Sequence, residues 1–97
     1  MYRSQFLADV RVFLETISEA DSAKIKAATD AMERNEFSAL YIKMVQSPIR
    51  ELIVKKYRLL FFIKNNEIYF VGIFIKKTAK TPKQEIEKAL RIYKLLK

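Results

Sequence analysis

Two long apolar segments, residues 57–64 and 67–77, are separated only by Asn65 and Asn66. Both segments are rich in the β-branched and aromatic residues that favour strands. Asparagine tolerates a positive φ, so the Asn pair suits a tight turn between antiparallel strands. Because both segments are apolar almost throughout, we expect both faces of this hairpin to be covered, as near the centre of a sheet.

Two amphipathic segments precede the hairpin and are predicted to be helices. The first carries a helical stripe of apolar residues: Phe6, Val10, Phe13, Leu14 and Ile17. The second runs from about Asp21 to Arg34, and Asp21 or Ser22 is its expected cap. These two helices are expected to form an antiparallel pair whose apolar stripes need a sheet to cover them.

Two shorter strands are predicted between the helices and the hairpin. Over residues 40–45, Leu40, Ile42 and Met44 alternate with Tyr41, Lys43 and Val45, which is the period of a strand. Ser47-Pro48 breaks this alternation, and residues 49–55 form the next strand candidate.

The segment from Lys76 to Arg91, KKTAKTPKQEIEKALR, carries the clearest helix signal in the chain. Thr81 is the expected N-cap, Pro82 fits the first helical position, and Gln84 completes a capping box. The predicted order is therefore α-α-β-β-β-β-α. The predicted class is α+β: two N-terminal helices on a mostly antiparallel four-stranded sheet, with a C-terminal helix.

Composition limits the chain to a single small domain over residues 1–97. With no cysteine and no histidine, neither a disulfide framework nor a zinc centre is expected. No apolar run approaches the roughly 20 residues of a membrane span, and the N-terminus lacks a signal-peptide pattern. These features favour a cytoplasmic protein with no membrane partner.

Positive charge is concentrated in the second half of the chain. The net charge is +8, and residues 49–97 carry 13 of the 19 Lys and Arg but only 4 of the 11 Asp and Glu. Such an asymmetry indicates an anionic partner, with RNA as the first hypothesis. The alternative is a solvated lysine-rich surface that aids solubility.

Arg58 is the most informative single residue, because it lies inside the apolar strand YRLLFFI. A buried guanidinium is costly without a partner. It is either a preplaced phosphate ligand or one half of a structural ion pair with Glu51. An unbroken hairpin register would pair Arg58 with Ile73 and place Lys56, Arg58 and Lys77 on one face.

The second half of the chain resembles the RelE/ParE superfamily of bacterial toxins, in its HigB-like, phage-derived branch. The matching motifs are Tyr57-Arg58, Lys76-Lys77-Thr78, Lys80-Thr81-Pro82, Glu85-Ile86-Glu87, Ala89 and Arg91. The first 48 residues match only in their layout of two helices before a sheet. The resemblance implies a small twisted sheet with two N-terminal helices on one face and a short C-terminal helix.

The resemblance also implies an activity: cleavage of mRNA on the ribosome by attack of a ribose 2′-hydroxyl on the adjacent phosphate, without a metal or other cofactor. Cations aimed at the charge that develops on phosphate would be the main catalytic contribution. Residue matching gives Arg58, Lys56 and Lys77 as catalytic residues. It gives Lys55, Lys76 and Lys80 as substrate-binding residues.

Two positions depart from the family pattern. Ile53 stands where relatives usually have arginine, and Gly72 stands roughly where many have histidine, so the proton-transfer group is unassigned. The alternatives are therefore a ParE-like inhibitor of DNA gyrase and an inactive relative that only binds an antitoxin. The expected partners are mRNA on the ribosome and a cognate antitoxin of the helix-turn-helix type.

Overall fold

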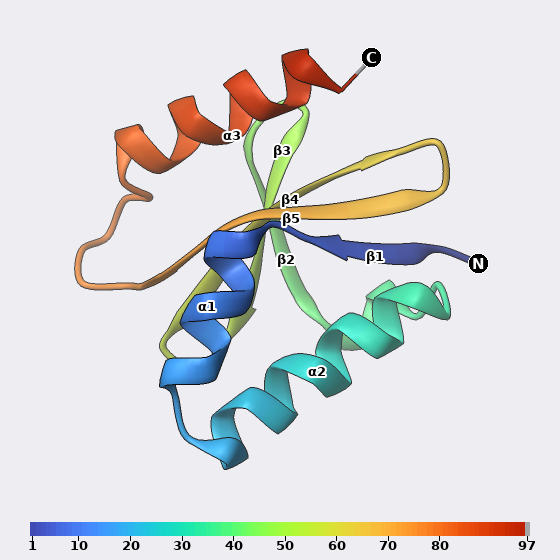
Figure 1. Cartoon of the computed structure of the whole chain (residues 1–97), viewed down its shortest axis with the longest axis vertical. Coiled ribbons are helices and arrows are strands. Elements are labelled where there is room, and N and C mark those ends of the chain that lie inside the picture. Colours follow the sequence, from blue (N-terminus) through green and yellow to red (C-terminus); the bar gives the residue numbers. More distant parts are fainter. Residues whose placement is uncertain (97) are drawn as a thin grey trace.

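The chain forms an α+β fold in which one five-stranded sheet lies between helices (Figure 1). The computed structural model describes residues 1–96. Its elements are β1 (Arg3–Phe6), α1 (Ala8–Thr16), α2 (Glu19–Glu33), the 3-10 helix η1 (Phe37–Ala39), β2 (Tyr41–Gln46), β3 (Ile49–Val54), β4 (Tyr57–Lys64), β5 (Glu67–Ile75) and α3 (Lys83–Leu95). The strand order is β1-β5-β4-β3-β2, with β1 parallel to β5 and the other neighbours antiparallel. The predicted fold class is confirmed, with five strands instead of four.

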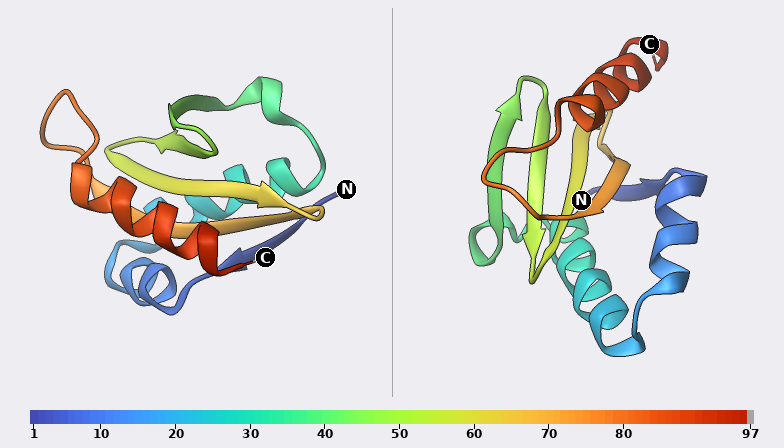
Figure 2. Two further views of the ribbon diagram at one scale, coloured as in Figure 1. Left: turned by 90° about the horizontal axis from the view of Figure 1, so that it is seen from above. Right: turned by 90° about the vertical axis from the view of Figure 1, so that its left-hand side faces the viewer.

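Helices cover both faces of the sheet (Figure 2). Helices α1 and α2 pack on one face and α3 on the other, so the sheet separates two apolar cores. Strand β4 contributes Leu59 and Phe61 to the first core and Leu60 and Phe62 to the second, all of them 0% exposed. Burying each such side chain is worth about 1.5–3 kcal/mol, which explains why this strand is apolar throughout.

The turn between β4 and β5 has the predicted form. Asn65 and Asn66 both have positive φ, 53° and 63°, and Lys64 pairs with Glu67. The hairpin register then holds as far as the pair Phe61 and Phe70.

A β-bulge in β5 changes the register of the hairpin beyond that point. Leu60 pairs with Gly72, so Val71 is an extra residue in β5. An extra residue shifts every later side chain to the opposite face. Arg58 consequently pairs with Phe74, and the predicted pairing with Ile73 is wrong.

The bulge also changes which lysine lies on the face of Arg58. The backbone N–H of Lys76 donates to the carbonyl of Lys56 at 2.9 Å, which extends the shifted register to the strand end. Lys76 therefore alternates onto the face of Arg58 and Phe74. The prediction that Lys77 shares this face assumed an unbroken register and is therefore wrong.

The N-terminal residues differ from the prediction. Residues 3–6 form the parallel edge strand β1, and the ring of Phe6 stacks on that of Phe70 with centroids 4.9 Å apart. Helix α1 begins at Ala8, so Phe6 belongs to the strand and not to the helix. Helix α2 begins at Glu19, and its cap is Ser18, which accepts from the N–H of Asp21.

The start of α3 also differs from the prediction. The helix begins at Lys83 with Pro82 at the N-cap position and no side-chain cap. The predicted capping box of Thr81 and Gln84 is therefore wrong, because the Thr81 hydroxyl points to Glu51 in the sheet. Within residues 1–96, none of the helices has the length and apolarity of a membrane span.

Candidate nucleic-acid interface

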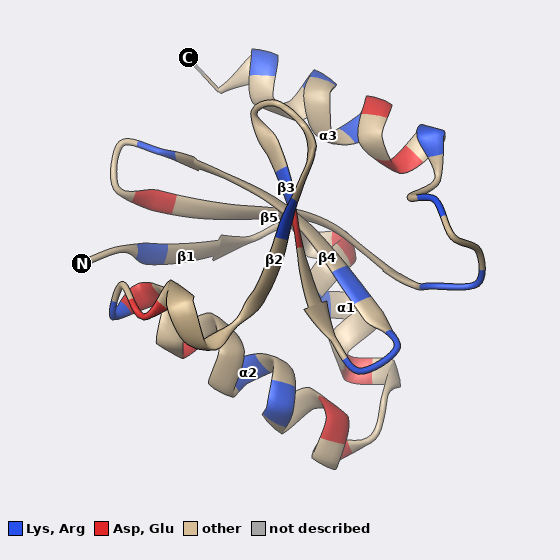
Figure 3. Ribbon diagram, turned by 180° about the vertical axis from the view of Figure 1, so that it is seen from behind, with Lys and Arg blue, Asp and Glu red and all other residues tan. Residues whose placement is uncertain are grey.

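Lys and Arg positions cluster along the chain where β4 begins and β5 ends (blue in Figure 3). The two-residue turn between β3 and β4 carries a lysine pair, and the loop of residues 76–82 runs from β5 to α3. The bond from Lys76 N to Lys56 O shows that the two segments are adjacent. We call this region the basic end; its predicted site residues are Lys55, Lys56, Arg58, Lys76, Lys77 and Lys80.

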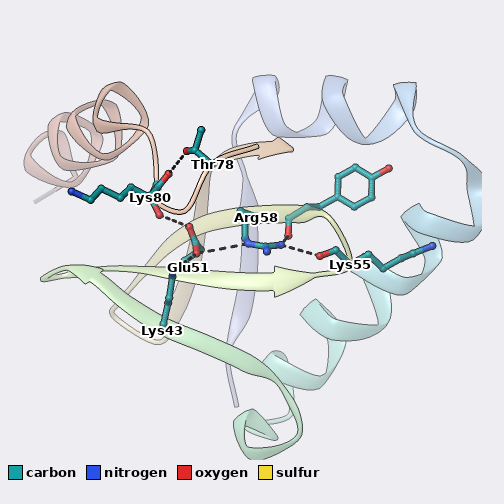
Figure 4. A network of polar contacts seen from close by, with 8 residues as sticks. Lys43, Glu51, Lys55, Arg58, Thr78 and Lys80 are labelled. Carbon is teal, nitrogen blue, oxygen red and sulfur yellow. Dashed lines mark hydrogen bonds and ion pairs between the residues drawn. The ribbon is translucent and has the colours of Figure 1, made fainter. Parts of the chain in front are cut away.

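The guanidinium of Arg58 is held by its own turn (Figure 4). Its Nη1 donates to the carbonyls of Lys55 at 2.9 Å and Tyr57 at 3.0 Å. Its Nε lies 4.0 Å from Oε1 of Glu51, and 17% of the side chain is exposed. Within the described residues, Nη2 makes no hydrogen bond. The ion pair with Glu51 considered from the sequence is thus present, and one nitrogen of the guanidinium is uncommitted.

Glu51 is the charged centre of this network and is fully buried in β3. Its Oε2 accepts a hydrogen bond of 2.7 Å from the hydroxyl of Thr81, in the loop before α3. Its Oε1 lies 3.4 Å from Nζ of Lys43, on β2. A buried carboxylate needs such partners, because an unpaired charge inside a protein is strongly disfavoured. Glu51 therefore ties three strands and one loop together at the basic end.

Lys55 and Tyr57 are directed to the opposite face of the sheet, towards α2. Nζ of Lys55 donates to Oδ1 of Asp21 at 2.6 Å, and the hydroxyl of Tyr57 donates to Oδ2 at 2.8 Å. These two hydrogen bonds lower the pKa of Asp21. The bond to Asp21 raises the pKa of Tyr57. Tyr57 is 3% exposed, so it is unsuited to transfer protons at the surface.

The turn at residues 55–56 has unusual backbone geometry. Lys55 has a φ of 55°, a backbone conformation that residues other than glycine, asparagine and aspartate adopt rarely. The Nζ of the exposed Lys56 lies 5.6 Å from the ring centroid of Tyr57. Such strain is often retained where the exposed side chains serve a function, and here the turn presents two adjacent lysines.

A groove of about 430 Å³ lies beside the end of β5, between α1 and α3. Its walls include Phe13 of α1, Glu85 of α3 and, from β5 and the following loop, Ile73, Phe74, Ile75, Lys76, Lys77, Thr78, Lys80 and Pro82. The strand β1 pairs with β5 only as far as Phe70, which leaves this edge of β5 without a neighbouring strand. The groove combines an apolar floor with three lysines, a composition that suits a nucleotide.

The four lysines near the groove differ in exposure. Lys56, Lys77 and Lys80 are exposed, and the Thr78 hydroxyl donates to the carbonyl of Lys80 at 3.0 Å. Lys76 is half-buried, and its Nζ has neither solvent contact nor a hydrogen-bond partner in the described part of the chain. The structure thus brings Arg58 and Lys76 to one face and puts Lys77 and Lys80 on the groove wall. It turns Lys55 towards α2 and places Nζ of Lys56 by the ring of Tyr57 on that same side.

Four residues of this region were not predicted as site residues. They are Asp21, Lys43, Thr81 and Glu85. Asp21 and Thr81 had been assigned to helix caps, since Asp and Thr before an amphipathic run are typical of caps. Nothing in the local sequence separates a capping threonine from one that bonds a residue in a distant strand.

The profile of a protein family described as "Phage derived protein Gp49-like (DUF891)" matches residues 12–94. The chain therefore belongs to the Gp49-like family. This family is of the RelE/HigB toxin type, which agrees with the resemblance seen in the second half of the sequence. Membership of a Gp49-like toxin family implies an antitoxin partner. A comparison with curated proteins found no match.

Proposed function

We propose that this Gp49-like protein is the toxin of a toxin–antitoxin pair and cleaves mRNA on the ribosome. The observation that carries the proposal is the state of Arg58. Its guanidinium is fixed by two carbonyls and a carboxylate, yet Nη2 is uncommitted within the basic end. A fixed cation with one free donor is suited to bind a phosphate oxygen.

The proposed reaction uses the substrate's own nucleophile. The ribose 2′-hydroxyl attacks the adjacent phosphorus, and negative charge grows on the phosphate oxygens. Arg58 and Lys76 are proposed to stabilise that charge, while the exposed Lys56, Lys77 and Lys80 bind the flanking backbone. Lys55, which the sequence predicted as a substrate-binding residue, is instead paired with Asp21. Preorganised cations act strongly here because they need no rearrangement during the reaction; losing one such donor costs about 100-fold or more in rate.

Glu51 has a positioning role in this proposal. A carboxylate that is 0% exposed and bonded to Thr81 is not available to an RNA substrate. Its charge holds Nε of Arg58 in place. The arginine therefore keeps one orientation before and during the reaction, which is what electrostatic preorganisation requires.

The antitoxin is proposed to neutralise the basic end with an acidic segment. The half of the chain that contains the basic end has nine more basic than acidic residues. Complementary charge of this size accelerates association and selects the partner. A helix-turn-helix domain on the antitoxin, which would bind the promoter of the pair, is proposed from the resemblance alone.

The test is cleavage of a defined mRNA on programmed ribosomes by the purified protein. We expect cleavage by the wild-type protein without added metal, and a loss of about 100-fold in Arg58→Lys, which keeps the charge but not the planar fork. Arg58→Lys is preferable to Arg58→Ala, because alanine would leave Glu51 without this partner. The control is Lys94→Ala, which removes a positive charge near the far end of α3. At 1.5 Å per residue, Lys94 is about 17 Å along the helix from Lys83, where α3 leaves the basic end.

Each other result points to a different function. Intact mRNA together with gyrase-trapped DNA breaks would favour the gyrase inhibitor. Intact mRNA, intact DNA and unaffected cell growth would favour an inactive relative that binds its antitoxin. Full cleavage by a folded Arg58→Lys variant would remove Arg58 from the proposed site.

A further inference from the structure

Gly72 leaves space on the sheet for the carboxylate of Glu85. Gly72 is the single glycine of the chain and lies in β5 opposite Leu60. A Cβ atom added at Gly72 would lie 3.3 Å from Oε1 of Glu85, which is tighter than an ordinary contact. The Glu85 carboxylate, from the first turn of α3, therefore lies over the strand where a side chain at position 72 would begin.

Glu85 is also the single carboxylate among the residues that line the groove beside β5. Within residues 1–96, its carboxylate is in no hydrogen bond or ion pair of the structure, although Lys76, Lys77 and Lys80 share the groove wall. The buried Nζ of Lys76 is likewise without a partner. The groove thus holds a carboxylate that the fold does not use, beside a buried ammonium that stays unpaired.

The other candidate acids and bases near the basic end are engaged elsewhere. Tyr57 donates to Asp21 on the opposite face of the sheet. Glu51 is fully buried and accepts from Thr81. Tyr69 contacts Glu67 at the start of β5, far along the strand from Ile75. This leaves Glu85 as the carboxylate that faces a space large enough for substrate.

We propose that Glu85 is the proton acceptor of the RNA cleavage proposed above, on which this inference rests. Its carboxylate takes the proton of the ribose 2′-hydroxyl as the O2′–P bond forms. The P–O5′ bond breaks, and the leaving 5′ oxygen takes a proton from water in the open groove. The products are a 2′,3′-cyclic phosphate and a 5′-hydroxyl. Loss of the proton from Glu85 to the hydroxide left in solvent then restores the starting state.

A purely structural role for Glu85 is the competing explanation. A carboxylate in the first turn of a helix stabilises it through the helix dipole. Glu87 is an exposed carboxylate two residues further along α3, so it offers a matched control outside the groove. A structural role would change the melting temperature of Glu85→Gln without changing the pH dependence of cleavage.

The experiment compares Glu85→Gln with Glu87→Gln in the ribosome cleavage assay, with mRNA footprinting on the ribosome as a binding measurement. General-base catalysis contributes about 100- to 10,000-fold. We therefore expect Glu85→Gln to lose at least about 100-fold in rate, to lose the acidic limb of its pH–rate profile and to keep wild-type binding and melting temperature. Glu87→Gln should match the wild type.

A second variant uses the shared space directly. Replacing Glu85 with alanine opens the position above β5, and Gly72→His then places an imidazole there. We expect the double variant Gly72→His/Glu85→Ala to cleave faster than Glu85→Ala alone, with a pH dependence that Glu85→Ala lacks.

The outcomes separate the two proposals. If the wild-type protein leaves ribosome-bound mRNA intact, the proposed function itself fails. If the wild-type protein cleaves and folded Glu85→Gln cleaves equally fast with the same pH profile, the proposed function stands and the role of Glu85 is overturned.

Discussion

The hydroxyl of Thr81 donates a hydrogen bond of 2.7 Å to Oε2 of the buried Glu51, thirty residues earlier in the chain. This bond fixes the loop between β5 and α3 against the centre of the sheet (Figure 4). The same carboxylate lies beside Arg58 on β4 and Lys43 on β2. The loop that carries the groove lysines and the strand that carries Arg58 are thus positioned by one buried charge.

Thr81→Val should loosen this loop. Valine keeps the shape of threonine but leaves the Glu51 carboxylate short of one donor, which costs about 1–3 kcal/mol for a buried charged group. Denaturant unfolding should show that loss, and hydrogen exchange should become faster in residues 76–82. Thr78→Val is the matched control, because the Thr78 hydroxyl bonds only the nearby carbonyl of Lys80 at an exposed position. Equal stability of the two variants would contradict the role of Thr81.

Removing the buried carboxylate should have a larger effect. Glu51→Ala leaves Arg58 and Lys43 without their shared partner, and breaking a buried ion pair from one side costs about 3–5 kcal/mol. The double variant Glu51→Met/Arg58→Met should recover part of that loss, since both buried charges are gone. The measurement is the free energy of unfolding in urea.

An exposed ion pair provides the comparison for Glu51→Ala. The pair of Arg34 and Glu36 is about half exposed on each side. Glu36→Ala should therefore change stability by no more than about 1 kcal/mol. A Glu51→Ala loss as small as this would show that the buried network contributes little.

The Asp21 contacts predict how stability depends on pH. The folded-state pKa of Asp21 is lowered by its bonds from Lys55 and Tyr57. The stabilisation of the folded state by ionised Asp21 is therefore present above the unfolded-state pKa of about 3.9. It is lost as the pH falls through the folded-state pKa. The pKa of Tyr57 is raised by Asp21. The stabilisation of the folded state by protonated Tyr57 is present below the unfolded-state pKa of about 10. It is lost as the pH rises through the folded-state pKa.

Asp21→Asn should flatten both limbs of the stability curve. Melting temperatures measured from acid to alkaline pH should fall less steeply in the variant than in the wild type at each extreme. Asp9→Asn is the control, because Asp9 is exposed and its contact with Lys88 is at the surface. If the melting temperatures of the wild type and Asp21→Asn changed with pH in the same way, the contacts of Asp21 with Lys55 and Tyr57 would not determine the pH dependence of stability.

The bulge at Val71 predicts that Lys76 and Lys77 contribute differently to cleavage. The backbone of Lys76 bonds Lys56 in the shifted register and so lies on the face of Arg58, whereas Lys77 lies one residue further into the loop. If the proposed reaction is correct, Lys76→Met should lower the cleavage rate by about 100-fold. Lys77→Met should mainly weaken RNA binding. The slope of the logarithm of the binding constant against the logarithm of the salt concentration should fall by about the amount of one phosphate contact. A larger rate loss in Lys77→Met would reverse this assignment.

The stack of Phe6 on Phe70 predicts that β1 is needed for stability. Phe6 is half-buried, so Phe6→Ala should cost about 2–3 kcal/mol, somewhat less than a fully buried phenylalanine. Val12→Ala, at a position that is 59% exposed on α1, should have little effect. Chemical denaturation measures the free energy of unfolding of both variants. If Phe6→Ala were as stable as the wild type, β1 would contribute no more to stability than the exposed surface of α1.

Elements whose signals are local were predictable from the order of residues. The apolar runs around Asn65 and Asn66 predicted β4, β5 and their turn, because side-chain periodicity and positive φ are properties of neighbouring residues. The two helices before the sheet, the covered faces of β4 and the excess charge near the basic end followed in the same way. The Lys-Lys-Thr motif and its neighbours were sufficient to indicate the toxin family.

Contacts between distant segments determine which of these residues meet. The bulge at Val71 moved Lys76 in place of Lys77 onto the face of Arg58. The neighbouring Gly72 is a local sign of a bulge, but it does not fix which residue is extra or how the register shifts. Phe6 fits a helical stripe, yet pairing and stacking with β5 made its segment a strand. Thr81 fits a cap, yet Glu51 in the sheet is its partner. For Phe6 and Thr81, a contact with a residue distant in sequence outweighs a local preference, for a helix or for an N-cap, that is worth about 1 kcal/mol.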